Sequence, residues 1–273
     1  MKGAVYGEVR LDVYLAEKGM AGSRTRALDL IKKGFVTVNG SIAKKASLDV
    51  DENDKISVTS DADEYVSRAA LKLKCAKEYF KIDFHGLTAV DLGASTGGFC
   101  QIMLEGGINE VFAVDIGHGQ LHERIAADER VHVLEGVNAR YVDEGVIGKK
   151  VDIVSADLSF ISQTLVFEAI TKILKRDGVY IGLIKPQFEA GRERVGKHGI
   201  VKDARVHAEV IEKVIKSANA HGLVCREVIP SPILGGDGNR EFLAYYINEG
   251  RQGEIPCRDK IERALKITEW SYE

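Results

Sequence analysis

The stretch that decides the fold is Asp91-Leu92-Gly93-Ala94-Ser95-Thr96-Gly97-Gly98-Phe99. It follows an apolar run at 88–92 that predicts a strand, and it leads into a helical pattern at 99–105. Glycines in such a turn let the backbone bend tightly and approach a ligand that would clash with a β-carbon. At the carboxyl end of a parallel strand, this turn is the usual ligand crevice of a doubly wound sheet.

The segments around this loop alternate between strand and helix patterns. Further strands are expected at 110–115, 131–134, 151–156, 178–184 and 242–247, and helices at 67–79, 161–174 and 203–221. Such alternation predicts an α/β fold, a doubly wound sheet of largely parallel strands with helices on both faces.

The N-terminal residues follow a different pattern. A short helix is expected within 9–22, and Ser23 caps a second helix whose predicted buried stripe is Ala27, Leu28, Leu30 and Ile31. Asn39-Gly40 predicts a tight hairpin turn between short strands. We therefore expect a small α+β domain over 1–60, a linker at 61–66, the larger α/β domain over 67–250 and a helical tail over 251–273.

The charge is distributed unevenly along the chain. The net charge of −3 excludes a wholly basic nucleic-acid coat protein, yet residues 1–48 carry nine Lys or Arg against four Asp or Glu. This segment has a net charge of +5, which leaves −8 for the remaining residues. A basic N-terminal segment before an acidic remainder predicts that the segment binds a polyanion. Arg24 and Arg26 stand in the first turn of a helix, where exposed amides already favour phosphate.

Composition excludes several other classes of protein. The four cysteines (Cys75, Cys100, Cys225 and Cys257) show no metal-ligand spacing, which predicts reduced thiols and no metal site. No apolar run has the length of a signal peptide or of a membrane helix. We therefore expect a soluble, cytoplasmic protein without a membrane partner.

The Gly-rich loop and the next strand together predict a nucleoside site. The loop departs from the Gly-x-Gly-x-x-Gly spacing of dinucleotide sites, and Asp91 before its first glycine suits a cationic ligand. Asp115 ends the next strand, where a carboxylate can accept hydrogen bonds from both ribose hydroxyls. An adenosine with a cationic neighbour describes S-adenosylmethionine, and NAD fits less well.

These motifs resemble those of known families. Residues about 65–248 are similar to FtsJ-type methyltransferases, which methylate the 2′-oxygen of a ribose, and residues 9–60 resemble the α-L RNA-binding module of a ribosomal protein. The two in this order resemble the TlyA, or haemolysin A, family of ribosomal-RNA 2′-O-methyltransferases. The most specific motifs are Ser-Arg-Ala-Ala-Leu-Lys-Leu at 67–73, Ala-Asp-Leu-Ser-Phe-Ile-Ser at 156–162, Leu-Ile-Lys-Pro-Gln-Phe-Glu at 183–189 and Gly-Asn-Arg-Glu-Phe-Leu at 238–243. Thr96 stands where many FtsJ-type loops have proline, which fits the TlyA branch.

The catalytic candidates stand at predicted strand ends and on the entering helix. Asp157 and Lys185 end strands, and Glu241 precedes one. A lysine whose pKa is depressed, for example by a second lysine, can help to deprotonate a ribose hydroxyl. The resemblance implies a Lys-Asp-Lys-Glu tetrad of Lys72, Asp157, Lys185 and Glu241, with Lys185 as the base or the group that orients the nucleophile. Lys74 is a close rival to Lys72 on the same helix.

The expected binding residues complete the prediction. For S-adenosylmethionine they are Asp91, Gly93, Ala94, Ser95, Thr96, Gly97, Gly98, Phe99, Asp115, Asn138, Asp157 and Phe160. Phe160 has a core phenylalanine as its alternative, and Asn138 an ordinary polar loop residue. For RNA they are Arg10, Arg24, Arg26, Lys32, Lys33, Lys44, Lys45 and Arg68.

The expected partner is ribosomal RNA or a ribosomal subunit, and no DNA. Three other functions stay open at this point: a non-catalytic ribosome-binding protein with a methyltransferase fold, a membrane-lytic protein, and a nicotinamide-dependent oxidoreductase. The intact acids and lysines argue against the first, and the absence of a spanning or lytic segment argues against the second.

Overall fold

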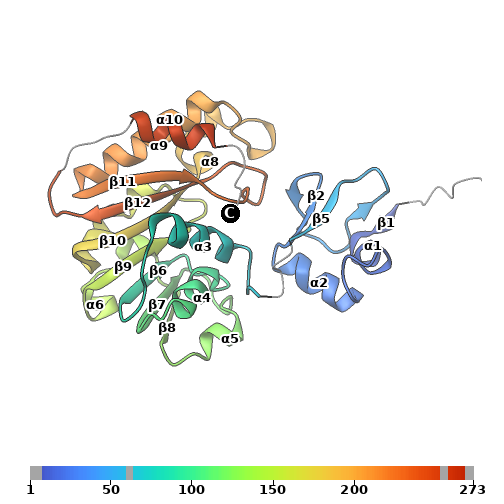
Figure 1. Cartoon of the computed structure of the whole chain (residues 1–273), viewed down its shortest axis with the longest axis horizontal. Coiled ribbons are helices and arrows are strands. Elements are labelled where there is room, and N and C mark those ends of the chain that lie inside the picture. Colours follow the sequence, from blue (N-terminus) through green and yellow to red (C-terminus); the bar gives the residue numbers. More distant parts are fainter. Residues whose placement is uncertain (1–7, 60–63, 253–257, 268–273) are drawn as a thin grey trace, which may run out of the picture. The chain divides into compact units, whose positions relative to one another are not determined.

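The computed structural model describes residues 8–59, 64–252 and 258–267, and it divides the chain into two compact units (Figure 1). The first unit comprises the residues up to Arg68 together with Gly236–Gly238, and the second comprises the rest. Residues 61–63 of the expected linker lie outside the described residues, as do 253–257 and 268–273 of the expected tail, with Cys257 among them.

The first unit is a small α+β fold. Its elements are β1 (Val9–Arg10), α1 (Leu11–Glu17), α2 (Arg24–Lys32), β2 (Val36–Val38), β3 (Ser41–Ile42), β4 (Asp49–Val50) and β5 (Ile56–Val58). Helices α1 and α2 contact each other, and Leu11 and Leu15 of α1 and Ala27 of α2 are fully buried. The strands form an antiparallel sheet in the order β3-β2-β5 and a separate β1–β4 pair.

Local sequence signals set most of this unit. The Ser23 hydroxyl accepts a hydrogen bond from the Arg26 amide at 3.1 Å, which confirms the predicted N-cap of α2. Asn39 and Gly40 both have positive φ, as the predicted hairpin turn requires. The expectation that Leu28 is buried is wrong, because its side chain is 45% exposed. It follows Ala27 by only 100° around the helix, so it falls off the face that repeats every three to four residues.

The second unit is built on a seven-stranded mixed sheet in the order β11-β12-β10-β9-β6-β7-β8. Its strands are β6 (Thr88–Leu92), β7 (Glu110–Asp115), β8 (Val131–Glu135), β9 (Val151–Ala156), β10 (Leu174–Ile184), β11 (Leu223–Pro230) and β12 (Phe242–Asn248). Neighbours from β10 through β8 are parallel, whereas β12 runs antiparallel to both β10 and β11. The prediction of a doubly wound α/β sheet is confirmed, with an antiparallel hairpin at one edge.

Helices connect and cover these strands. They are α3 (Ala69–Phe80), α4 (Gly98–Glu105), α5 (Glu123–Ala126), α6 (Glu144–Ile147), α7 (Phe167–Ile173), α8 (Pro186–Glu189), α9 (Ala204–Ala220) and α10 (Arg258–Lys266), with the 3₁₀ turns η1 (Ala139–Tyr141), η2 (Gln163–Leu165), η3 (Arg192–Arg194) and η4 (Lys197–Gly199). Helices α7, α9 and α10 share one hydrophobic core with the sheet, while α3 and α4 pack on each other and contact β12 and β7.

Two expectations for the second unit need correction. Strand β11 was not predicted, because charged Arg226 and Glu227 interrupt its apolar run and a bulge there breaks the alternation. The helix expected over 161–174 is divided into η2 and α7. The break falls at Val166, whose φ of −117° departs from helical geometry.

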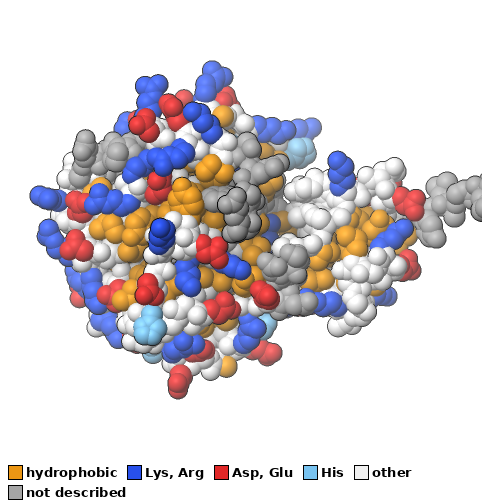
Figure 2. Space-filling view, viewed as in Figure 1, with side chains coloured by type: hydrophobic (Ala, Val, Ile, Leu, Met, Phe, Trp, Pro, Cys, Tyr) orange, Lys and Arg blue, Asp and Glu red, His pale blue; other side chains and the backbone are white. Residues whose placement is uncertain are grey.

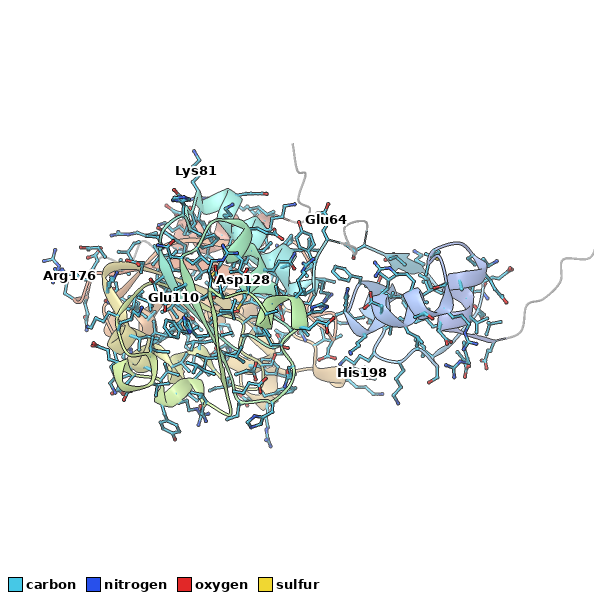
Figure 3. All side chains as sticks on the ribbon, turned by 90° about the horizontal axis from the view of Figure 1, so that it is seen from below. Glu64, Lys81, Glu110, Asp128, Arg176 and His198 are labelled. Carbon is cyan, nitrogen blue, oxygen red and sulfur yellow. The ribbon has the colours of Figure 1, made fainter. Side chains whose placement is uncertain are left out.

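The topology brings distant segments to one edge of this sheet. Parallel β6, β7, β9 and β10 end at the same edge, and antiparallel β12 begins there. Arg176, at the beginning of β10, and His198, in η4, lie at opposite ends of this unit (Figure 3). The edge formed by the carboxyl ends of the parallel strands carries the candidate site.

Candidate active site

Four charged side chains that are far apart in the sequence meet at this edge. Asp157 directly follows β9, Lys185 directly follows β10, and Glu241 directly precedes β12. Lys72 reaches the same place from α3, whose contact with β12 positions it. The structure therefore brings all four predicted tetrad residues together.

The four groups form one chain of ion pairs with alternating charge. Lys72 Nζ lies 3.1 Å from Asp157 Oδ2 and 2.8 Å from Glu241 Oε2. Lys185 Nζ lies 2.5 Å from the other oxygen of Asp157. Asp157 thus stands between the two lysines, and Lys72 stands between the two carboxylates.

Burial makes these pairs chemically strong. The side chains of Lys72 and Lys185 are 7% and 8% exposed. Burial disfavours the charged form of Lys72, but attraction to Asp157 and Glu241 outweighs it and raises the pKa of Lys72. Burial likewise opposes ionisation of Asp157, yet the two lysines hold the pKa of Asp157 well below its usual range. The sequence suggested that a second lysine could depress a lysine pKa. Lys72 does not show this effect, because the carboxylate of Asp157 lies between the two ammonium groups.

Further polar residues hold this network in place, and the sequence reading missed them. The Lys185 ammonium donates to Ser159 Oγ at 3.0 Å, and the Gln187 amide donates to Glu241 Oε1 at 3.4 Å. Glu189, 4% exposed, accepts hydrogen bonds from Ser162 Oγ at 2.5 Å and from the Gln163 amide at 2.7 Å. Glu189 therefore ties the loop after Asp157 to the helix after Lys185. Each of these residues lies within five positions of a residue that the sequence predicted. This closeness in sequence is the signal that could have pointed to them.

The Gly-rich loop lies beside the network. A β-carbon at Gly93 would stand 3.0 Å from the Asp157 carbonyl oxygen, and Gly93 has a φ of +81°, so only glycine suits this position. The Ser95 amide donates to Asp115 Oδ2 and the Gly117 amide to Asp115 Oδ1, each at 2.8 Å. The Asp115 carboxylate is thereby fixed beside the loop, and each of its oxygens keeps a further lone pair that can accept another hydrogen bond.

Two predicted cofactor residues point into the protein. Phe99 is 3% exposed on α4, and Asp91 is 1% exposed, accepting hydrogen bonds from Ser155 Oγ at 2.8 Å and Cys100 Sγ at 3.3 Å. Burial without a basic partner raises the pKa of Asp91 to about 7, although both hydrogen bonds oppose the shift. These two side chains support the loop from within.

Other residues at this edge offer apolar surface. Phe160 is 90% exposed with a φ of +65° and lies 5.2 Å from the Phe188 ring, so it is not a core phenylalanine. Ile116, which the sequence reading missed, directly follows Asp115 and is 64% exposed. The Asn138 side chain accepts a hydrogen bond from the Arg140 amide at 3.0 Å and so caps η1. Exposed apolar side chains therefore lie on the loops that follow β7 and β9.

The predicted RNA-binding residues of the first unit are basic and mostly exposed. Arg10 and Arg24 both bind Asp12, whereas Arg26 and Lys33 both bind Asp29 on their own helix. Lys32, Lys44 and Lys45 are exposed, and the Arg68 side chain packs over Gly34.

On the face of the second unit that is drawn in Figure 2, positive and negative side chains are interspersed. Among the described residues, no group of His, Cys, Asp and Glu side chains could hold a metal ion. No helix in 8–59, 64–252 or 258–267 is both long and apolar enough to cross a membrane.

A glycine loop, a carboxylate fixed at the end of β7 and a buried Lys-Asp-Lys-Glu network, all at one edge of this sheet, define a class I methyltransferase that uses S-adenosylmethionine. Residues 65–247 match the model of the FtsJ-like methyltransferases, and residues 9–56 match the S4 domain. The chain belongs to the TlyA family of FtsJ-like methyltransferases, in which an S4 domain precedes the catalytic domain.

Individual relatives agree with this assignment. The chain is 40% identical over 237 residues to the 16S/23S rRNA (cytidine-2′-O)-methyltransferase TlyA of Mycobacterium tuberculosis, covering 86% of this chain and 88% of that protein. It is 36% identical to Hemolysin A of Brachyspira hyodysenteriae, covering 88% of this chain and 100% of that protein. A solved structure of a Streptococcus thermophilus protein classed as a hemolysin superposes with a TM-score of 0.74 at 35% identity, covering 95% and 96% of the two chains.

Proposed function

We propose that this protein transfers the methyl group of S-adenosylmethionine to the 2′-hydroxyl of a cytidine in ribosomal RNA. The observation that carries the proposal is the buried network of Lys72, Asp157, Lys185 and Glu241 beside the glycine loop. The M. tuberculosis relative and one from Campylobacter jejuni, 31% identical over 258 residues, are both named for methylation at this ribose atom of cytidine.

The residues of the site suit this chemistry. When bound, S-adenosylmethionine supplies an electrophilic methyl group; residues 93–98, Asp115, Asn138 and Phe160 are the ones we assign to hold it. A ribose hydroxyl is a poor nucleophile while protonated, so the enzyme must orient it and remove its proton. We assign both tasks to Lys185. As the ammonium held by Asp157 and Ser159 it would orient the hydroxyl oxygen by donating a hydrogen bond, and it could accept the hydroxyl proton only as the neutral amine, after giving up a proton of its own. Lys72 and Glu241 would then hold the ribose.

In this proposal, the first unit binds the RNA. Its exposed arginines and lysines suit phosphate groups, since arginine binds phosphate through several N–H donors at once. We propose ribosomal subunits, in the cytoplasm, as the partner, and expect neither DNA nor a membrane as a substrate.

The test is methyl transfer from tritiated S-adenosylmethionine to purified small and large ribosomal subunits that lack the modification. The wild type should label at least one subunit, and nucleoside digestion should recover 2′-O-methylcytidine. Lys185→Ala should leave the subunit unlabelled, while Lys175→Ala, an exposed lysine on the same strand, should label it normally. If the wild type labels neither subunit, the proposed function is wrong.

A further inference from the structure

The first unit contains a buried carboxylate that the proposed function does not use. Asp12, in the first turn of α1, is 1% exposed. Its Oδ1 accepts a hydrogen bond from Arg10 Nε at 3.0 Å, and its Oδ2 accepts from Arg10 Nη2 at 3.2 Å and from Arg24 Nη2 at 2.8 Å. One buried acid therefore holds two guanidinium groups from different elements.

Both of these guanidinium groups remain at the surface. The side chains of Arg10 and Arg24 are 48% and 60% exposed. The two cations outnumber the one buried anion, although the exposed carboxylate of Asp49, opposite Arg10, also attracts that guanidinium. Each arginine keeps several N–H donors that Asp12 does not engage. The group is thus electrically suited to a phosphate.

The position of Asp12 is fixed by the backbone around it. The Leu11 amide donates to the Leu48 carbonyl at 2.7 Å, and the Asp12 amide donates to the Ala46 carbonyl at 3.1 Å. The two arginines also hold the pKa of Asp12 at about 2, so the carboxylate is ionised at neutral pH. A fixed, charged anchor is what is needed to hold two long side chains in one arrangement.

We propose that Asp12 is a positioning residue for RNA binding, which holds Arg10 and Arg24 ready to bind the phosphate backbone. The proposal rests on the proposed function, in which this unit binds RNA. Ordering a flexible side chain on binding reduces affinity, and an arginine that is already held loses less freedom. Asp12 would therefore raise affinity although it carries the same charge as the RNA.

The sign of the effect separates this role from simple electrostatics. Removing a negative charge near a phosphate-binding surface should strengthen RNA binding if charge alone matters. Removing the anchor should weaken binding if the arginines need to be positioned. Asp12→Asn keeps the shape and removes the charge that holds both guanidinium groups.

The experiment measures binding of the full-length protein to the ribosomal subunit that the wild type methylates, by filter binding over a series of salt concentrations. Asp12→Asn should bind about tenfold more weakly. Its slope of log affinity against log salt should be unchanged, because the number of cations is the same. Asp49→Asn is the matched control. Asp49 is exposed and lies opposite Arg10 in the backbone register of β1 and β4, and removing its charge should leave RNA binding unchanged or tighter.

A second variant guards against a folding defect in Asp12→Asn. Arg24→Lys keeps the charge at an exposed position and should weaken binding severalfold, since lysine lacks the planar fork of donors. Asp12→Asn should have no further effect in a background of Arg10→Ala and Arg24→Ala. Wild-type or tighter binding by both single variants would overturn the proposal while leaving methyl transfer intact. A wild type that methylates no subunit would instead refute the proposed function.

Discussion

Each unit of the molecule places one buried carboxylate between two basic side chains, but the basic groups differ in exposure. In the first unit, Arg10 and Arg24 are about half exposed around Asp12. In the second, the side chains of Lys72 and Lys185 are only 7% and 8% exposed, even less than that of Asp157 between them at 14%. Exposed cations can reach a large polyanion and are screened by salt, whereas buried ones act on a small group that enters the site. Under our proposals, the same arrangement of charges would serve binding in one unit and chemistry in the other.

The largest expected effect is the loss of methyl transfer in Asp157→Asn. It removes the charge between the two lysines, and we expect the rate to fall about 10²- to 10⁴-fold, as when a positioned proton-transfer group is lost. Single-turnover rates and RNA affinity should be measured together. Affinity should stay near the wild-type value, since the first unit is unchanged. Asp152→Asn, on the same strand and bound to Lys175, is the control and should retain activity. An equal loss of rate and affinity would contradict the division of labour.

The next effect is on stability. Lys72→Met leaves the carboxylates of Asp157 and Glu241 buried together without the cation that joins them. Breaking a buried ion pair in this way costs about 3–5 kcal/mol of unfolding free energy. Urea unfolding, followed by a spectroscopic signal that reports on the second unit, should show this loss of unfolding free energy. The double variant with Glu241→Gln should recover part of the lost free energy. A change below about 1 kcal/mol would mean that the network behaves like a surface pair.

A smaller effect is expected from charge reversal in the first unit. Arg24→Glu should weaken RNA binding about tenfold at low salt, and the effect should shrink as salt increases. Arg26→Glu should have a smaller effect, because Arg26 is only 28% exposed and binds Asp29. Neither should alter S-adenosylmethionine binding measured by calorimetry. Arg176→Glu, at the far end of the second unit from His198 (Figure 3), is the control and should bind RNA as the wild type does. A larger loss of RNA affinity in Arg26→Glu than in Arg24→Glu would contradict the argument from exposure.

The last expected effect is a pH dependence of stability caused by Asp91. Burial raises its pKa from 3.8 to about 7, so the folded state retains a proton that the unfolded state has released. Stability therefore falls as pH rises from about 4 to about 7. Melting temperatures of the wild type and Asp91→Asn should diverge across this window, with the variant less sensitive to pH. Asp12 has the opposite sign, since its pKa of about 2 adds stability that is lost only as pH falls toward that value. Parallel curves for wild type and Asp91→Asn would refute the assignment.

Local sequence was enough to predict several parts of the site. The glycine loop and the strands that precede Asp115, Asp157 and Lys185 are local patterns of apolar spacing and turn residues. Because parallel strands end at one edge of a sheet, residues at those ends could be expected to meet. The partner strand β11 could not be predicted in the same way, because its pattern is interrupted by charge and its place follows from pairing with β12.

The choice between Lys72 and Lys74 shows where sequence reasoning stops. Both lie on α3, and only packing against β12 decides that Lys72 turns toward Asp157 and Glu241. The contact between Arg24 and Asp12 likewise joins residues on two helices. A pattern along one chain carries the period of an element but not the neighbour that the element will meet.

By itself, the sequence determined the order of the two domains, the glycine loop, the acid at the end of the strand that follows it and the sign of charge on each part. Only the tertiary structure decided which charges are buried and which face solvent. That decision sets their chemistry, since a charge in the interior is governed by its few neighbours and a charge at the surface by water and salt. Thus the loop at 91–99 could be read from its own residues, whereas the roles of Asp12, Asp91 and Asp157 depended on what folding placed beside each one.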